Sequence, residues 1–220
     1  MRAARVNYSL STRIFETPAA CRFLASSPTP ESLLRESQAE VIFIGRANVG
    51  KSSLLNSVMG RKDLVKTSSK PGRTQALNFF QVGPEIGKLT LVDAPGYGKR
   101  GRPEWGKVFE HYLETRQSSL RRVFLLVNAK HGFSTYDEMM LQDLDRRFSE
   151  TAGLSFGYQI VLTKIDTLST AADIIKAKDE VEQEAQKVTR AWTTSALVTS
   201  TQGRGFGIDK LREAIIQACN

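Results

Sequence analysis

One short stretch of the chain combines glycines, a lysine and serines at a spacing that suits phosphate binding. It reads GRANVGKSS, covers residues 45–53, and lies between an apolar run at 41–45 and a helical pattern at 51–60. Glycines let the backbone turn through angles that other residues avoid, so that N–H groups and a helix N-terminus can converge on phosphate oxygens. The spacing is that of a P-loop, G-x-x-x-x-G-K-S, in its strand–loop–helix context. A glycine turn that merely caps a core helix is the alternative, which this context disfavours.

The polar residues of this loop have distinct expected roles. Lys51 supplies a positive charge for the β- and γ-phosphates of a nucleotide, and the Ser52 hydroxyl is a ligand for the Mg²⁺ that they carry. We expect the whole loop to contact the nucleotide. Its residues are Gly45, Arg46, Ala47, Asn48, Val49, Gly50, Lys51, Ser52 and Ser53.

A second motif, DAPG, closes the apolar run LTLVDA. In an open α/β sheet, ligands bind beyond the carboxyl ends of the strands, so Asp93 is expected beside the P-loop. Its carboxylate can hold Mg²⁺ directly or through water, and the Gly96 N–H can contact a γ-phosphate. Loss of that contact after hydrolysis would let the following segment relax. We expect Asp93, Ala94, Pro95 and Gly96 to line the nucleotide site.

A third motif, TKID, indicates which base is bound. Asp166 can accept hydrogen bonds from N1–H and the 2-amino group of guanine, and adenine offers neither donor. A site built around such donors rejects a ligand that lacks them by roughly 10⁴–10⁵. Lys164 can cover the purine face, Thr163 can tie this loop to the P-loop, and Ile165 completes the motif. Three motifs in this order, each at a predicted strand end, favour GTP and GDP as ligands.

Two further stretches are expected to complete the site. The run AWTTSA ends in Thr194, Ser195 and Ala196, where a backbone N–H could reach the guanine O6. We favour Ser195 and Ala196 because they directly end the apolar run, although a helix-approach turn is equally compatible and VTST at 198–201 is a rival for the role. In SSKPGRTQ, residues 68–75, Thr74 could supply a second hydroxyl to Mg²⁺ and sense the γ-phosphate.

The apolar runs predict a single α/β domain. We expect strands at 41–45, 78–83, 89–94, 123–129, 158–163 and 191–196, and helices near 51–60, 104–118, 136–149, 171–188 and 207–218. Continuous apolar strands that alternate with helices predict a mostly parallel sheet, buried on both faces. The strands at 78–83 and 89–94 are close in sequence, so a hairpin with one antiparallel strand is expected. The predicted fold is a three-layer P-loop NTPase.

Composition limits the possible partners. The 220 residues include 31 Lys and Arg against 23 Asp and Glu, a net charge of +8 that suits either a polyanionic partner or simple solubility. No apolar run approaches the ~20 residues that span a bilayer, so we expect no membrane insertion. The two cysteines, Cys21 and Cys219, show no metal spacing, which favours a reducing compartment.

The N-terminal region permits two interpretations. The first fifteen residues carry Arg2, Arg5 and Arg13 and no acidic residue, a composition typical of an organelle transit peptide. The alternative is a basic arm that joins the fold, with an edge strand between Val6 and Phe15. We expect an N-terminal arm and irregular lead-in at 1–38, followed by the nucleotide-binding domain at 39–220.

With these residues in hand, the chain resembles the EngB (YihA/YsxC) family of GTPases, whose fold is a Ras-like G domain. The resemblance covers roughly residues 15–218 and rests on GRANVGKSSLLN, KPGRTQALNFF, LVDAPGYG, LTKID and GIDKLREAI. It implies that Ser52 and Thr74 bind Mg²⁺ and that Gly72, Arg73, Thr74, Gln75 and Ala76 contact GTP. It also implies a role in assembly of the large ribosomal subunit, with ribosomal RNA as partner. The lead-in resembles that of organellar members, which favours the mitochondrial matrix.

The resemblance also frames the expected mechanism. Many small GTPases place a water-orienting glutamine just after D-x-x-G, and Tyr97 stands there in this chain, so we expect slow intrinsic hydrolysis. In related GTPases an asparagine at the position of Asn48 helps to bind K⁺, which can take the place of an arginine finger; a plain turn residue is the alternative. The residues expected to take part in hydrolysis are Lys51, Asn48, Thr74 and Gly96.

Basic residues after the second motif suggest how nucleotide state and RNA affinity could be linked. Lys99, Arg100, Arg102 and Lys107 follow DAPGYG, with Arg121 and Arg122 farther along the chain. A monomeric, GTP-gated assembly factor is the favoured function. The alternatives are a P-loop enzyme that transfers phosphate to a small acceptor and, less consistent with the absence of an amphipathic insert, a membrane-remodelling GTPase.

Overall fold

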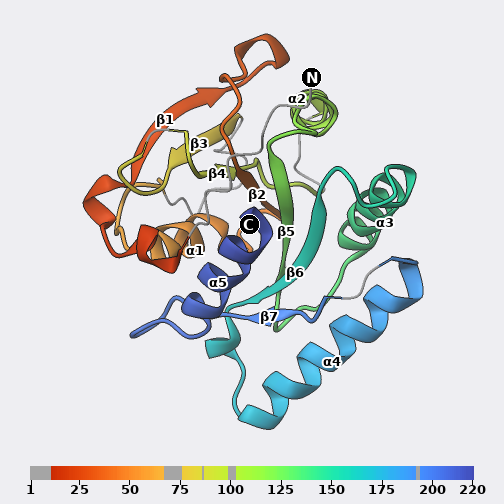
Figure 1. Ribbon diagram of the computed structural model, residues 1–220. Helices are drawn as coiled ribbons and strands as arrows, with labels where there is room; N and C mark the ends of the chain where they lie inside the picture. Colours follow the sequence, from red (N-terminus) through yellow and green to blue (C-terminus); the bar gives the residue numbers. More distant parts are fainter. Residues whose placement is uncertain (1–10, 67–75, 86, 99–102, 192–193) are drawn as a thin grey trace.

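The structure is a computed structural model that describes residues 11–66, 76–85, 87–98, 103–191 and 194–220. Seven strands in these ranges form one sheet in the order β1-β3-β4-β2-β5-β6-β7 (Figure 1). The strands are β1 Arg22–Ser27, β2 Glu40–Gly45, β3 Leu77–Gln81, β4 Thr90–Asp93, β5 Leu120–Asn128, β6 Gly157–Thr163 and β7 Leu197–Val198.

Only β3 runs against its neighbours within this sheet. It pairs antiparallel with β1 and β4, whereas the β2–β4, β2–β5, β5–β6 and β6–β7 pairs are parallel. The predicted hairpin and the mostly parallel sheet with one antiparallel strand are confirmed. Because β2, β4 and β6 run in the same direction, the segments that follow Gly45, Asp93 and Thr163 all leave the sheet at one edge.

Helices cover both faces of the sheet, which makes the three-layer arrangement (Figure 1). The α-helices are α1 Lys51–Val58, α2 Pro103–Thr115, α3 Thr135–Glu150, α4 Ala171–Val188 and α5 Ile208–Cys219. α1 and α5 pack on one face, where Leu54 and Leu211 are among the buried residues. α2, α3 and α4 pack on the other, where they bury Tyr112, Leu144 and Val181 against the strands.

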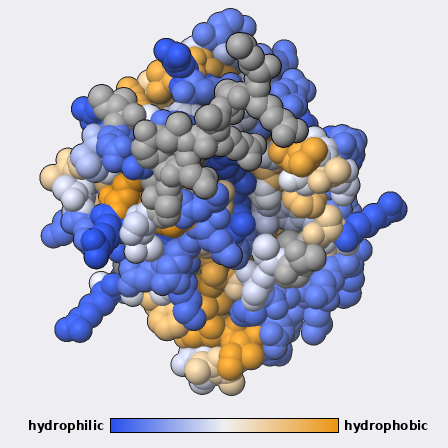
Figure 2. Space-filling view, viewed as in Figure 1, coloured by the Kyte–Doolittle hydropathy of each residue, from blue (hydrophilic) through white to orange (hydrophobic). Residues whose placement is uncertain are grey.

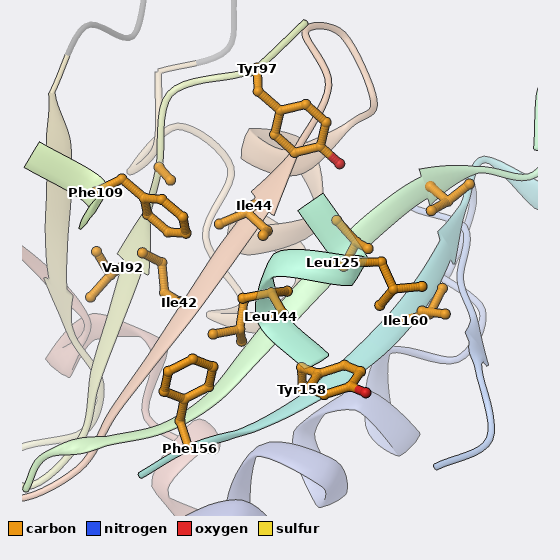
Figure 3. Packing of buried hydrophobic residues seen from close by; sticks show 14 of the residues in the cluster. Ile42, Ile44, Val92, Tyr97, Phe109, Leu125, Leu144, Phe156, Tyr158 and Ile160 are labelled. Carbon is orange, nitrogen blue, oxygen red and sulfur yellow. The ribbon is translucent and has the colours of Figure 1, made fainter. Parts of the chain in front are cut away.

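The two cores on either side of the sheet explain why the strands read as continuous apolar runs. Along β2, Ile42 and Ile44 belong to the core under α2–α4, and Val41 and Phe43 belong to the core under α1 and α5. Alternate side chains of a strand point to opposite faces, so burial on both sides requires apolar residues at successive positions. Figure 3 shows part of the first core, with Ile42, Leu125 and Ile160 contributed by three neighbouring strands.

Two of the sequence-based predictions about strands are wrong. No strand occupies the described part of 191–196; β7 is only Leu197–Val198, which pairs with Val161 and Leu162 of β6. The lead-in is not irregular throughout, because residues 22–27 form β1 at the sheet edge beside β3. Phe15 and Cys21, which precede β1, are buried in the core under α1 and α5. The proposed strand between Val6 and Phe15 falls partly on residues that the structure does not describe; its described end contains the short 3₁₀ helix Thr12–Phe15.

In the described part of the chain, no helix combines the length and apolarity that crossing a membrane requires.

Candidate functional site

The P-loop lies between β2 and α1, as its sequence predicts. Gly50 has a φ of 104° at the N-cap of α1, in the left-handed region that glycine adopts without steric cost. Asn48, with a φ of 63°, also adopts this region, and asparagine tolerates it better than most residues. A side chain at Gly45 would bring a Cβ within 2.9 Å of Val49 Cγ1, so Val49 packs directly against the first residue of the loop. The first turn of α1 therefore opens at the sheet edge, where an anion can meet its N-terminal N–H groups.

An ion pair joins the P-loop to the DAPG motif. Lys51 Nζ lies 2.9 Å from Asp93 Oδ1, and the two side chains are 8% and 1% exposed. Asp93 is the last residue of β4, which pairs with Phe43 of β2. The sheet register thus places Asp93 beside the end of β2, from which the P-loop leads to Lys51, as the two motifs predict.

The same carboxylate fits a divalent cation. Asp93 Oδ2 is buried and makes no hydrogen bond within the described residues. Ser52, the second residue of α1, is half-buried at the same edge. Hydroxyl and carboxylate oxygens are the hard ligands that Mg²⁺ prefers, and this ion usually takes its remaining ligands from phosphate and water. Ser52 and Asp93 could therefore hold the Mg²⁺ of a bound nucleotide.

The segment after Asp93 continues alongside the P-loop strand. Ala94 N–H donates to the Phe43 carbonyl at 3.1 Å, and Tyr97 N–H donates to the Gly45 carbonyl at 3.2 Å. Between them, a Cβ built on Gly96 would lie 2.9 Å from both the N and the Cα atoms of Ala47. Glycine is needed at this point because the two backbones touch. The DAPG segment is therefore placed directly against the phosphate-binding loop.

The base-binding side of the site lies between the loops after β6 and β7. Thr163 Oγ1 donates to the Val49 carbonyl at 2.6 Å, which confirms the predicted tie between TKID and the P-loop. Lys164 Nζ donates to the Asn48 carbonyl at 2.8 Å, and its Cε would lie 3.4 Å from a Cβ on Gly50. The lysine stem thus crosses the P-loop glycine. Ile165 is buried, where it anchors the loop that presents Asp166.

Asp166 borders a cavity large enough for a purine. The cavity has a volume of about 260 Å³, and its lining includes Gly50, Lys164, Asp166, Thr199 and Thr201. Ser200 Oγ donates to Asp166 Oδ1 at 2.5 Å, which holds the carboxylate in place. Thr199 N–H donates to the Leu162 carbonyl, and Ile165 N–H donates to the Thr199 carbonyl. The stretch after β7 therefore packs directly against TKID.

The residues favoured for the guanine O6 contact do not line the cavity beside Asp166. Thr194, Ser195 and Ala196 precede β7, and Thr194 Oγ1 donates to the carbonyl of Tyr158, near the beginning of β6 rather than its end. Ala196 N–H and Ser195 Oγ both donate to the Glu182 carboxylate on α4, at 2.7 Å and 2.9 Å. The rival stretch, 198–201, is the one beside Asp166. Residues 194–196 do not reach the base side because β7 starts only at Leu197, where the predicted strand ends, so the residues that follow it are 199–201.

Part of the predicted site lies outside the described residues. This applies to Gly72, Arg73, Thr74 and Gln75, and also to the basic residues Lys99, Arg100 and Arg102. Ala76, the last residue of that predicted stretch, is buried directly before β3.

Sequence reasoning missed a polar cluster beside the P-loop. Tyr97 donates its hydroxyl to Asp137 Oδ1 at 2.6 Å, and Arg46 Nε lies 2.9 Å from Asp137 Oδ2. Arg46 also donates from NH2 to the Gly132 carbonyl at 3.0 Å. Asp137 is wholly buried, and burial, followed by the charge of Asp137, raises the pKa of the Tyr97 hydroxyl well above its usual range. The pattern Ser134-x-x-Asp137 signals a helix start, but nothing in it points to the P-loop.

The chain is similar in sequence to known proteins over most of its length. The 50S ribosome-binding GTPase family matches residues 40–164. A probable GTP-binding protein EngB from Rhodopseudomonas palustris (strain BisB18) is 39% identical over 201 residues, which cover 89% of this chain and 88% of the relative. Another from Rhodospirillum rubrum is 41% identical over 199 residues, covering 87% and 81%.

The chain belongs to the EngB family of GTPases.

Solved structures agree with the fold of this EngB-family chain. Era, in a complex with MgGDPNP and nucleotides 1506–1542 of 16S ribosomal RNA, superposes with a TM-score of 0.61 at 21% identity, over 84% of this chain and 57% of Era. A probable GTP-binding protein engB gives a TM-score of 0.50 at 20% identity, over 82% and 98%. At these identities the likeness supports the P-loop GTPase fold alone.

Proposed function

We propose that this EngB-family GTPase is a nucleotide-gated factor in assembly of the large ribosomal subunit. The observation that supports the proposal is that Lys51, Asp93 and Asp166 lie at one sheet edge, where they would form a phosphate site and a base site. The net charge of +8 suits a ribosomal RNA partner, and the matched family is described as 50S ribosome-binding. In this proposal the GTP-bound protein binds the large-subunit precursor, and hydrolysis of GTP to GDP releases it.

The roles of the site residues follow from their positions. Lys51 would neutralise the β- and γ-phosphates, and the Gly96 N–H would contact the γ-phosphate from the segment that touches Ala47. Ser52, Asp93 and Thr74 would hold Mg²⁺, whose charge offsets the negative charge on the transferred phosphoryl group. Asp166 and the backbone at 199–201 would select guanine. A slow intrinsic rate follows, because the Tyr97 hydroxyl is bonded to Asp137 and does not replace a water-orienting glutamine.

A potassium ion is a further element of the proposed mechanism. Asn48 lies in the left-handed turn of the P-loop, and its carbonyl accepts a hydrogen bond from Lys164 Nζ. A K⁺ ion beside this turn would supply positive charge where an arginine finger acts in other GTPases. Replacing KCl by NaCl at equal ionic strength should then lower turnover at least tenfold in the native protein. The Asn48→Ala variant should show the same low rate in both salts; equal turnover of the native protein in both salts rejects the role.

The ribosomal role is tested by sedimentation in sucrose gradients with GTP, GDP or no nucleotide. We expect the protein to migrate with a large-subunit precursor in GTP and to leave it in GDP. Replacing Lys99, Arg100, Arg102 and Lys107 by alanine should abolish co-migration. A matched control removes four exposed lysines elsewhere, Lys62, Lys176, Lys187 and Lys210, and should retain it.

The outcomes separate the candidate functions. Equal co-migration in GTP and GDP would remove the switching claim, and none in any state would remove the ribosomal role. GTP-dependent phosphorylation of a small acceptor would favour the alternative phosphotransferase function.

The proposed location is the mitochondrial matrix, on the basis of the acid-free N-terminal stretch with Arg2, Arg5 and Arg13. Import into isolated mitochondria tests it. The Arg2→Glu, Arg5→Glu, Arg13→Glu triple variant should fail to enter, and import that is unaffected by these changes would contradict the proposal. The protein is also proposed to be a monomer, which sedimentation equilibrium can measure.

A further inference from the structure

We infer that Tyr97, Asp137 and Arg46 act together as positioning residues for GTP hydrolysis. They form a clamp that holds the DAPG segment against the P-loop and ties both to the start of α3. The inference relies on the GTPase activity of the family but not on the proposed ribosomal role.

The clamp is built around one buried carboxylate with four donors or cations. Asp137 Oδ1 accepts the Tyr97 hydroxyl at 2.6 Å, and Oδ2 lies 2.9 Å from Arg46 Nε. Oδ2 also accepts the N–H and the hydroxyl of Ser134, each at 2.8 Å. Since Asp137 is wholly buried, these partners offset the cost of removing its charge from water. Two segments that are distant in sequence, at Arg46 and Tyr97, are therefore held by a side chain at the start of α3.

The clamp acts on the backbone that approaches the phosphate site. Arg46 and Tyr97 are bridged by their backbones, and Tyr97 N–H donates to the Gly45 carbonyl at 3.2 Å. Gly96, directly before Tyr97, is in contact with Ala47 of the P-loop. Any shift of the Tyr97 side chain is therefore transmitted within one residue to Gly96. Fixing the donor of a γ-phosphate contact before the reaction is how preorganised groups lower a barrier.

The Tyr97 side chain itself is not placed to meet the nucleotide. Its ring is packed in the core under α2–α4, and Figure 3 shows it above Ile44. Its hydroxyl points to Asp137, not to Lys51 or Asp93. Tyr97 thus contributes position rather than chemistry.

The chain offers a matched control on the same helix. Tyr158 donates its hydroxyl to Asp145 Oδ1 at 2.5 Å, and both residues are buried. This pair has the same chemistry as Tyr97 and Asp137 and also anchors α3, but Tyr158 lies near the beginning of β6, away from the P-loop edge. A hydroxyl removed from either tyrosine should affect folding similarly, whereas only Tyr97 should affect hydrolysis.

The test compares Tyr97→Phe with Tyr158→Phe by single-turnover GTP hydrolysis and by the KM for GTP. Thermal unfolding of each variant identifies a temperature at which both are folded, and the kinetics are measured there. We expect Tyr97→Phe to lower the hydrolysis rate about tenfold with KM for GTP within twofold, because misplacement affects the reacting geometry more than binding. Tyr158→Phe should keep the native rate. Arg46→Gln, which changes a partly exposed side chain, is a second variant that should reproduce the loss.

Two results would overturn the inference. One is an unchanged hydrolysis rate in Tyr97→Phe and Arg46→Gln. The other is an equal loss of rate in Tyr97→Phe and Tyr158→Phe, which would show a general effect of the hydroxyl on folding. If the native protein hydrolyses GTP but does not bind ribosomal particles, the proposed function fails. The effect of the clamp variants on the hydrolysis rate can still be measured.

Discussion

Lys51 Nζ and Asp93 Oδ1 lie 2.9 Å apart, so the cation that should meet phosphate is neutralised by the carboxylate that should meet Mg²⁺. Both side chains are buried, and removing one partner leaves the other charge unpaired in a poorly hydrated place. We expect the phosphate of a bound nucleotide to compete with the carboxylate for Lys51.

Replacing Asp93 by Asn should therefore destabilise the nucleotide-free protein by about 3 kcal/mol. In EDTA, where Mg²⁺ does not contribute, GDP should raise the melting temperature more in Asp93→Asn than in the native protein, because phosphate restores the missing negative charge beside Lys51. Thermal unfolding with and without GDP measures this. Asp179→Asn, at an exposed position on α4, is the control; equal GDP shifts in all three proteins would refute the argument.

Base selection depends on the Asp166 carboxylate beside the cavity of about 260 Å³. Asp166→Asn should weaken GTP binding by about 10²- to 10⁴-fold, since each of two hydrogen bonds to a charged group contributes about 1.5–3 kcal/mol. Affinity for ATP should change little, so discrimination between the two nucleotides falls. Isothermal titration calorimetry of both nucleotides checks this, again with Asp179→Asn as control. Unaltered GTP affinity would contradict the assigned contact.

Substitution of two serines distinguishes the two candidate stretches for the base contact, 198–201 and 194–196. Ser200→Ala removes the donor that orients Asp166 and should lower GTP affinity about tenfold at little cost in stability. Ser195→Ala removes a hydrogen bond to Glu182 and should lower the free energy of unfolding by about 1 kcal/mol with no change in affinity. Calorimetry and urea unfolding of both variants provide the comparison. The reverse pattern would reinstate 194–196 as the base contact.

Acid should remove the contribution of Asp145 to stability. Burial raises the pKa of this carboxyl, but hydrogen bonds from the Tyr158 hydroxyl and from the N–H groups of Arg190 and Ala191 outweigh it, so the pKa is lowered in the folded state. A lowered pKa stabilises the fold above the unfolded value of about 3.9, and that gain is lost as the pH falls through the folded pKa. The stability difference between the native protein and Asp145→Asn, from urea unfolding, should therefore be constant from pH 7 to 5 and shrink below pH 4. If the stability difference between the two proteins grows as the pH falls, the pKa of Asp145 is not lowered by folding and this explanation is wrong.

Local patterns in the sequence predicted most of the sheet and the sheet edge at which the candidate site residues lie. The helix predicted at 171–188 has those bounds in the structure, because an amphipathic pattern follows the capping box of Thr170 and Asp173. Lys51, Asp93 and Thr163 could be placed together because each ends or follows a strand of the same direction.

The features that were missed depend on pairing between distant segments. The two residues of β7 are too few for a periodic signal, so the sequence favours a longer neighbouring run as the strand. β1 has little apolar character, RFLASS, and forms because β3 offers it an edge. The bonds of Asp137 to Arg46 and Tyr97 bridge 91 and 40 positions of the chain (137 − 46 and 137 − 97), and no local pattern encodes them.

The pairing of β1 with β3 sets an order of events during synthesis. Residues 22–27 leave the ribosome well before their partner at 77–81, and the whole P-loop is made in between. Until β3 emerges, this N-terminal strand has no edge to join and Phe15 has no finished core to enter. This edge strand is thus made before the neighbour that it needs, so the nascent chain must keep it from mispairing until β3 has emerged.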